Sequence, residues 1–324
     1  MKKIVAKITF SFLILMVVFA DGVENSVIPV MERFECIENL PSQKFTKKQF
    51  SEISSALEKK EEMIRLVTYN MLFNLYDHNL DEENRWPNRL PRIIELIYEM
   101  QPDIINTQEL YPTQVQEIVN LIGDDFSFFP GQKDEDGESY GIFYRTDRFE
   151  LLSSQIDYPL SMVQLKDLKT DKIIHVFNTH MPLSNIEKRE ANAHKISQII
   201  EPFAEQMAVI FTGDLNTFPG RLDLTDLPFY DGDYIHRILS KGSLKNSHSE
   251  SLLGHFGPIS TFTNNSTNVK PFQGTGTPGI ILDYIYVSEK VTVLTHAVEQ
   301  GTVNGHFPSD HMPVLIDFLI KNPS

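Results

Sequence analysis

The chain has a single cysteine, Cys36, among its 324 residues. One cysteine cannot form a disulfide within the chain, and it cannot supply the thiolate cluster of a structural zinc site. Cys36 also lies well beyond the apolar N-terminal run, where a lipid-modified cysteine is not expected. No H-E-x-x-H motif occurs, and the histidines are not spaced for one helix face, which argues against a zinc hydrolase.

Basic residues are also scarce. The 29 lysines and arginines stand against 44 aspartates and glutamates, which gives a formal net charge of −15 at pH 7. A surface this acidic repels nucleic acid at long range, so the composition disfavours a non-specific nucleic-acid binder. A local metal site could still hold one phosphate group.

Long apolar runs are absent except at the N-terminus, where one extends from Ile8 to Ala20. It follows Lys2, Lys3 and Lys7 and ends at a small residue, which is the pattern of a secretory signal peptide. The run is shorter than the ~20 residues that span a bilayer, so we favour cleavage near Ala20 over an uncleaved membrane anchor. Cleavage would remove three lysines and no acid, and the formal charge would move from −15 to −18. We therefore expect a secreted or periplasmic protein.

The remaining chain has the composition of a globular protein, with 41% hydrophobic residues. We predict a signal peptide over residues 1–20, a leader over 21–63 and one layered α/β domain over 64–321. Within the leader, Thr46–Met63 is predicted to form an amphipathic helix with a capping box of Thr46 and Gln49. The polar segment 231–273 has little periodicity and is predicted to be loops with short elements, which often determine substrate choice.

Strand and helix patterns alternate from Arg65 onward. The predicted strands are RLVTYNM (65–71), PDIINTQE (102–109), YGIFYR (140–145), KIIHVFNTH (172–180), MAVIFTGDLN (207–216), IILDYIYVS (280–288), KVTVLTHAV (290–298) and MPVLIDFLI (312–320). The predicted helices cover Arg89–Met100, Thr113–Ile122 and Ile186–Gln206.

Polar side chains stand at the ends of these strands. They are Asn70, Glu109, His180, Asp214, Asn216, Asp310 and His311. Asp283 differs because it shares a strand face with the aliphatic residues Ile281 and Ile285, and a buried carboxylate there needs a partner. Alone, an aspartate or asparagine at a strand end is typical of a turn, and a histidine is typical of an ordinary surface or core position. Their joint occurrence at so many strand ends is not explained by turns.

The ordered set TYN, QE, NTH, GDLN, LDYI and SDH resembles the endonuclease/exonuclease/phosphatase superfamily. That family includes DNase I, apurinic endonucleases, deadenylases, inositol-polyphosphate 5-phosphatases and neutral sphingomyelinases. The resemblance covers roughly Ile64 to Ile320. It implies a DNase I-like fold of the α/β (α+β) class, a four-layer sandwich of two packed mixed β-sheets flanked by helices. It also implies a metal-dependent hydrolase that cleaves phosphate esters by in-line attack of an activated water.

The resemblance assigns roles to the strand-end residues. Mg²⁺, or alternatively Mn²⁺, would be held by Glu109, and Asn70 and Asp310 would complete or adjoin that site. Asp283 and His311 match the family's buried pair, in which the carboxylate fixes the tautomer of the ring. Either His311 or Asp214 would be the general base. That choice stays open at this point.

Three further residues are carried over from the family. Asn216 would donate its amide to a phosphate oxygen and help position Asp214, His180 would contact the phosphate, and Glu138 would pair with His180. Glu138 stands beside the acidic run 134–136, and the alternative interpretation is a solvated loop. The chain departs from the family pattern at Leu72, where many members carry an acid or tryptophan. It also has no arginine between Arg148 and Arg189, so phosphate binding would depend more on the metal and the two histidines.

The leading hypothesis is thus an exported Mg²⁺-dependent phosphoesterase, nuclease-like by family, acting on nucleic acid, a phospholipid or a phosphoinositide headgroup. Alternatives are a neutral sphingomyelinase C and a phosphoinositide phosphatase. An alternative of another class is a catalytically inactive surface binding protein with the same fold. No stable protein partner is implied, and we expect a monomer.

Overall fold

The computed structural model describes residues 51, 55–56, 58–75, 77–133, 137–217, 219, 230–263 and 280–322. The predicted signal peptide, half of the predicted leader helix including its capping box, and the end of the polar segment lie outside the described residues. The first described strand begins at Ile64, and the last ends at Ile320. These two strands pair antiparallel, so both ends of the folded region lie in one sheet.

The first sheet has seven strands in the order β10-β12-β13-β1-β2-β4-β3. It is mixed, because β1 runs parallel to β2 and antiparallel to β13. Its members are β1 (Ile64–Asn70), β2 (Ile104–Gln108), β3 (Phe126–Lys133), β4 (Ser139–Arg145), β10 (His255–Phe256), β12 (Val291–Val298) and β13 (Val314–Ile320).

The second sheet has six strands in the order β5-β6-β7-β8-β11-β9. It is mixed as well, since β8 runs parallel to β7 and antiparallel to β11. Its members are β5 (Phe149–Asp157), β6 (Leu160–Asp167), β7 (Ile173–His180), β8 (Ala208–Asp214), β9 (Lys245–Asn246) and β11 (Asp283–Val287).

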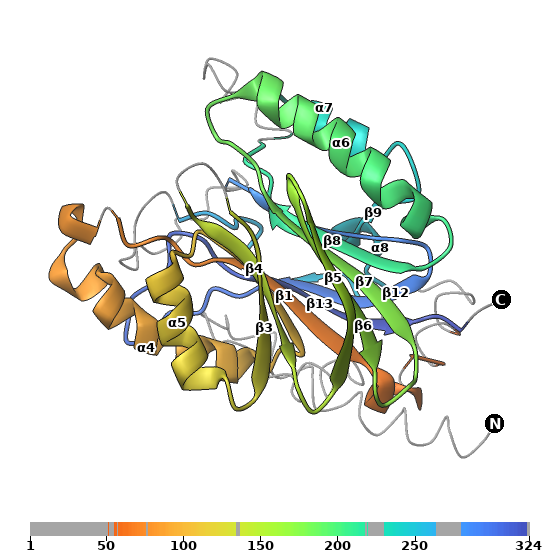
Figure 1. Cartoon of the computed structure of the whole chain (residues 1–324), viewed down its shortest axis with the longest axis horizontal. Helices are drawn as coiled ribbons and strands as arrows, with labels where there is room; N and C mark the ends of the chain where they lie inside the picture. The colour runs from red at the N-terminus through yellow and green to blue at the C-terminus, as the bar shows by residue number, and fades with distance from the viewer. Residues whose placement is uncertain are drawn as a thin grey trace, which may run out of the picture.

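Helices cover the outer faces of the two sheets (Figure 1). The first sheet carries α4 (Trp86–Met100) and α5 (Pro112–Ile122), and the second carries α6 (Ile186–Ala204) and α7 (Tyr234–Leu239). The short α8 (Ser247–Glu250) and the 3-10 turns η2 (Lys60–Glu62), η3 (Asp77–Asn79) and η4 (Glu82–Asn84) complete the described elements. The predicted four-layer sandwich of the DNase I-like type is thereby confirmed.

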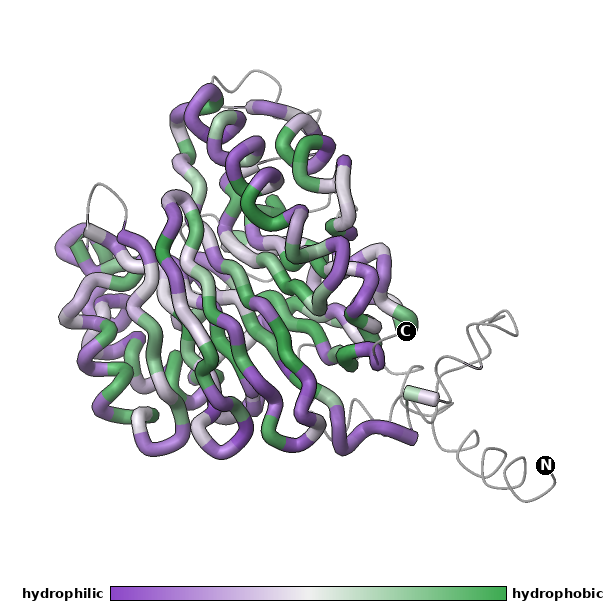
Figure 2. The backbone as a smooth tube through the Cα atoms, turned by 45° about the vertical axis from the view of Figure 1, so that its right-hand side comes forward, coloured by the Kyte–Doolittle hydropathy of each residue, from purple (hydrophilic) through white to green (hydrophobic). Residues whose placement is uncertain are grey.

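The apolar core lies between the sheets and under each helical layer. Aliphatic residues of β1, β2, β7, β8, β11 and β13 fill the space between the sheets. Figure 2 shows these strands as a hydrophobic band inside a more polar outline. Helix α4 buries Ile93, Leu96, Ile97 and Met100 at the spacing of one helix face. No helix among the described residues has the length and apolarity to cross a membrane.

The predicted strands all occur, with ends shifted by up to three residues. Strands β3, β5 and β6 were not predicted, and the two-residue strands β9 and β10 lie in the segment predicted as loops with short elements. Strand β5 is the edge of its sheet, and nearly all its side chains are exposed. Its residues therefore carry no alternation between buried and exposed positions. Helix α4 begins at Trp86 rather than Arg89 because Pro87 is accepted in the first turn of a helix.

A buried ion pair joins β1 to β13 on the face toward α4. Arg65 Nε lies 2.6 Å from Asp317 Oδ1, and Arg65 Nη2 lies 2.8 Å from Asp317 Oδ2. The guanidinium also donates to the carbonyl of Met100, and Thr295 Oγ1 donates to the carboxylate. The pair therefore links the end of α4 to three strands, with every charged group satisfied inside the protein.

Replacing Arg65 by methionine should lower the free energy of unfolding by about 3–5 kcal/mol, because Asp317 would stay buried without its partner. The matched control is Arg145→Met at the exposed pair with Asp147, which should cost less than about 1 kcal/mol. Urea unfolding followed by the fluorescence of buried Trp86 measures both. Equal losses in the two variants would contradict the structural role of the Arg65–Asp317 pair.

Candidate active site

The predicted site residues lie at one edge of the sandwich, where β1, β2, β7 and β8 end. The ladder of the second sheet sets His180 opposite Asp214, and Asp214 opposite Asp283. In the first sheet Asn70 is opposite Gln108, the residue before Glu109. Asp310 and His311 precede β13, which lies beside β1. Two sheets thus contribute side chains to one region.

Along the strands that lead to the site, the inward-facing side chains change from apolar to polar toward the strand end. On β8 the inward side chains are Ala208, Ile210, Thr212 and Asp214, because side chains alternate along a strand. A layer of buried polar side chains therefore separates the apolar core from the charged residues. This polar layer consists of Thr68, Asn106, Gln108, Asn178 and Thr212.

Hydrogen bonds of the polar layer cross from sheet to sheet. Asn106 Nδ2 donates to Thr212 Oγ1 at 2.7 Å, and Gln108 Nε2 donates to Asn178 Oδ1 at 2.7 Å. Asn178 Nδ2 then donates to the carbonyl of Thr107. These bonds fix the position of one sheet on the other directly beneath the site. The strand-end motifs did not indicate this layer, although alternation along the strands leads from Asn178 to His180 and from Thr212 to Asp214.

The Asn70 amide lies between two carboxylates. Its Nδ2 donates to Glu109 Oε1 at 2.8 Å and to Asp214 Oδ2 at 3.0 Å, while its Oδ1 accepts from the backbone N–H of Leu72. The bond from Leu72 fixes which amide atom faces the carboxylates. Asn70 therefore holds Glu109 and Asp214 together in this arrangement and presents no oxygen to them.

Backbone strain helps to direct Glu109 into the site. Its φ is 57°, and Asn216 has a φ of 48°. Left-handed backbone is uncommon for residues other than glycine and gathers at functional sites. In a regular strand Glu109 would point away from Gln108 and from the second sheet, and the left-handed turn brings it to the same side as Asn70.

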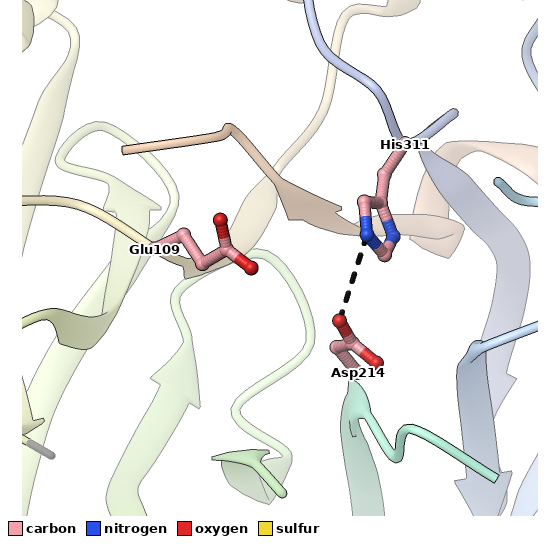
Figure 3. Close-up of side chains that lie close together, drawn as sticks. All are labelled: Glu109, Asp214 and His311. Atoms are coloured by element: carbon pink, nitrogen blue, oxygen red, sulfur yellow. Dashed lines mark ion pairs between the residues drawn. The ribbon is translucent and has the colours of Figure 1, made fainter. Parts of the chain in front are cut away.

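The cluster Glu109, Asp214 and His311 is shown in Figure 3, where the two carboxylates and the ring surround a common space. Each of the three offers a ligand atom, and these atoms lie within 4.8 Å of one another. The predicted metal set was Glu109, Asn70 and Asp310, which shares only Glu109 with this cluster. The two carboxylates supply the oxygen donors that a hard divalent cation prefers.

The His311 ring stands between two acids. Its Nδ1 lies 2.8 Å from Asp283 Oδ2, and its Nε2 lies 3.7 Å from Asp214 Oδ2. Burial alone would lower the pKa of the ring, but Asp283 and Asp214 outweigh it and raise the pKa of His311 well above its ordinary value. The ring is therefore held as an imidazolium at neutral pH, with Asp283 fixing its orientation.

The acids of the site are themselves perturbed. Burial raises the pKa of Asp214, Asp283 adds to the rise, and the rings of His311 and His180 oppose it. Burial likewise raises the pKa of Glu109, and the charge of Asp310 adds to that rise. Negative charge is thus concentrated where little water can stabilise it, which is the electrostatic condition for cation binding.

His180 approaches the same space from β7. Its Nε2 lies 3.7 Å from Asp214 Oδ2 and 3.8 Å from Glu109 Oε1, and its Nδ1 lies 4.0 Å from Glu138 Oε2. Glu138 is only 6% exposed and faces the histidine, unlike a residue of a solvated loop. The neighbouring acids 134–136 lie outside the described residues.

Asn216 connects the catalytic candidates through its backbone and its side chain. Its N–H donates to Asp214 Oδ1 at 2.9 Å, and its Nδ2 lies 3.3 Å from His180 Nε2. Asp310 is buried nearby but belongs to no close pair with Glu109; its carbonyl accepts from the backbone and hydroxyl of Thr263. The structure thus brings the nine predicted residues to one edge of the sandwich, with Asp310 and Glu138 at the periphery of the cluster.

Residues that hold the loops of the site were missed in the sequence. Buried Arg89 of α4 donates to the carbonyls of Met71, Leu72 and Pro308. Ser309 Oγ donates to the carbonyl of Asn70. These bonds fix the loop after β1 to the loop before β13. The sequence does contain a pattern that indicates burial of Arg89, because this residue falls four positions before Ile93 on the apolar face of α4.

Arg189 has the same role in the second sheet. Its Nε donates to Asp231 Oδ2 at 2.8 Å and its Nη1 donates to the carbonyl of Pro182. Thr217 Oγ1 donates to the other oxygen of Asp231. The chain segments after β7 and after β8 are therefore joined through one buried carboxylate. Like Arg89, Arg189 stands four residues before a buried residue, Ala193, on its helix.

Gly213 is required by the close approach of β7. A Cβ atom at this position would lie 2.3 Å from the carbonyl oxygen of Thr179, which is backbone and cannot move aside. The glycine of the GDLN motif therefore lets Asp214 lie directly beside His180.

Solved structures with the same fold are known. A mannosyl-6-phosphatase of Bacteroides thetaiotaomicron is 21% identical, with a TM-score of 0.65 over 79% of this chain and 100% of that chain. The human Nocturnin catalytic domain with bound sulfate is 19% identical, with a TM-score of 0.58 over 81% of this chain and 94% of that chain. TDP2 of D. rerio in complex with a single-stranded DNA product is 19% identical, with a TM-score of 0.58 over 79% of this chain and 98% of that chain.

At these identities the likeness shows the fold alone. No curated protein sequence matches the chain significantly. The sequence profile of the Endonuclease/Exonuclease/phosphatase family matches residues 67–311, well over half of the chain. This range begins in β1 and ends at His311, so it includes all the candidate residues described above. The chain belongs to the Endonuclease/Exonuclease/phosphatase family.

Proposed function

We propose that the protein is a divalent-metal-dependent phosphoesterase that hydrolyses its substrate by in-line attack of water. The observation that carries this proposal is the pair of carboxylates, Glu109 and Asp214, beside the ring of His311, with one oxygen or nitrogen atom of each residue within 4.8 Å of the others. The membership of the chain in a family of phosphatases and nucleases supports it. A binding protein without activity would not need an imidazolium and two strained or buried carboxylates in one place.

Mg²⁺ fits the donors better than a softer ion. Glu109 would hold it, and Asp310 adds negative charge nearby. His311 does not fit as a ligand, because both of its nitrogens face carboxylates. When bound, the ion would neutralise charge on the phosphoryl oxygens.

Asp214 is the better candidate for the general base. A base must accept a proton, and the elevated pKa of Asp214 brings its carboxylate closer to the working range of such a group. His311 is already protonated between Asp283 and Asp214, so it is suited to donate to a phosphate oxygen instead. The amide of Asn216 and the ring of His180 lie beside Asp214 and would contact the same phosphoryl group.

A small phosphate ester is favoured over a long polynucleotide. The formal charge of −15 opposes a polyanion at long range. Arg89 and Arg189, the buried arginines beside the site, are directed to backbone carbonyls and Asp231. The name of the Bacteroides neighbour shows that one member of the fold acts on a sugar phosphate. The nuclease, sphingomyelinase and phosphoinositide hypotheses are the other outcomes of the assay below.

Export is proposed from the N-terminal sequence alone. Expression of the full chain in a bacterial host should yield a mature form that begins near Asp21, because the small residue Ala20 ends the apolar run. N-terminal sequencing of the periplasmic and medium fractions measures this. Recovery of the intact chain only in the membrane fraction would instead support the uncleaved anchor.

The activity is tested with a panel of substrates in Mg²⁺, in Mn²⁺ and in EDTA. The panel holds sugar phosphates, phosphoinositides, sphingomyelin, DNA, RNA and a chromogenic phosphodiester. We expect turnover with the metal and none in EDTA, and Asp214→Ala should lower kcat about 10²–10⁴-fold because the base is lost. The control is Asp147→Ala at an exposed acid. Turnover that survives both EDTA and Asp214→Ala would refute the proposal.

The role of His311 is tested through its partner. Asp283→Asn keeps the shape of the side chain but removes the charge that raises the pKa of His311, so kcat should fall about 10²–10⁴-fold. An imidazolium contributes below its pKa and is lost as pH rises through it. The alkaline limb of the kcat–pH profile should therefore move down toward about pH 6.5 in the variant. An alkaline limb in the same place as in the wild type would exclude His311 as the acid.

A further inference from the structure

Three of the ten histidines gather away from the proposed active site, at the edge of the seven-stranded sheet. His255 belongs to β10, His296 to β12 and His248 to α8. Helix α8 lies next to β12 and also next to β9 and β11 of the second sheet. Figure 1 shows this region at the end of the sandwich opposite α4 and α5. None of these histidines has a role in the proposed hydrolysis.

The backbone sets two of the rings opposite each other. His255 and His296 are partners in the parallel ladder of β10 and β12, so their side chains leave the sheet on the same face. His296 is also opposite Ile316, which faces the core between the sheets. The N–H groups of Leu252 and Leu253 donate to carbonyls of β12 and fix the chain before β10.

The three rings form a triangle with equal sides. The ring centroids are 5.1 Å apart for His248 and His255, for His248 and His296, and for His255 and His296. Imidazoles that bind one tetrahedral ion through nitrogens at 2.0–2.1 Å place their ring centres about 5 Å apart. The ring centres therefore have the spacing of a three-histidine metal site, but the nitrogens of all three rings do not lie within 4.8 Å of one another, so a ring must turn before one ion is bound.

The hydrogen bonds leave a lone pair on His255 that points at His296. His255 Nε2 lies 2.9 Å from the carbonyl oxygen of Pro258, which can only accept, so Nε2 carries the hydrogen. Nδ1 of the neutral ring then carries a lone pair, which accepts the hydrogen of His296 Nδ1 at 2.9 Å, and an ion bound between the two nitrogens would replace that hydrogen. A carbonyl on the far nitrogen is the usual support of a metal-binding histidine.

We propose that His248, His255 and His296 form a binding site for a borderline transition-metal ion of the Zn²⁺ class. Imidazole nitrogens suit Zn²⁺, Cu²⁺ and Ni²⁺, whereas Mg²⁺ prefers oxygen. His248 is exposed and joins the pair when its ring turns a nitrogen toward the other two. A fourth position would be open to water.

The ion would connect the two sheets at the edge of the sandwich where β10, β12 and α8 lie. It would join β10 and β12 of the first sheet to α8, which lies against the second. The chain that follows His255 leads to Phe262, whose ring packs edge-on against His311. Metal binding at this cluster would therefore stabilise the start of the segment that lies behind the active site.

Zinc binding is measured by equilibrium dialysis of the purified protein against micromolar Zn²⁺ in millimolar Mg²⁺. We expect one bound Zn²⁺ that His311→Ala leaves in place, because that variant alters only the active site. His248→Ala and His255→Ala should each weaken binding at least about tenfold, since a ligand is lost. The matched control is His194→Ala, at an exposed histidine of α6 outside the cluster, which should bind as the wild type does.

His248 is exposed, so its variant should fold, and the fluorescence of Trp86 checks this. A rise of Tm with Zn²⁺ in the wild type, absent in His248→Ala, is the second readout. The proposal is wrong if the wild type takes up no zinc, if His248→Ala and His255→Ala bind it unchanged, or if only His311→Ala loses it. The first outcome would leave a hydrogen-bonded histidine pair, and the last a zinc ion at the active site.

Discussion

The hydrogen bonds between the two sheets are the constraint on which the site depends. Asn70 and Glu109 come from one sheet, and His180 and Asp214 come from the other, so a small sliding of the sheets would separate them. Apolar contact between sheets is not directional and cannot prevent such sliding. The bonds of the polar layer are directional, and in a buried setting leaving them unmade is costly. The hydrogen bonds that fix the packing of the sheets therefore also bring the site residues together.

The Asn70 amide explains how two of the acids are tolerated inside the sandwich. Glu109 and Asp214 share a donor whose own position is fixed. Asn70 serves Glu109 and Asp214, and its orientation is set by the N–H of Leu72. The carbonyl of Leu72 is in turn held by Arg89. The charged edge is thus supported by polar groups that are themselves anchored in the core, and the strained backbone of Glu109 is held by this support.

Much of this arrangement could be predicted from the sequence, for a physical reason. Alternation along a strand puts Thr212 and Asp214 on one face, and apolar residues before them make that face the buried one. Strand ends and inward residues follow from such local patterns. Distances between sheets do not, because they depend on how two surfaces pack. The bridging amide of Asn70 and the edge strand β5 are set by neighbours distant in sequence, so no local pattern indicates them.

Histidine shows how the fold determines chemistry through neighbours. His311 lies between two carboxylates, which hold it protonated, so it can donate to an anion but cannot bind a metal. His296 is also buried, but burial and the two adjacent imidazoles lower its pKa to about 3. A neutral imidazole keeps a lone pair and can bind a metal, and a carboxylate partner at each nitrogen removes that possibility. One residue type would therefore serve a phosphate at one edge of the sandwich and a cation at the other.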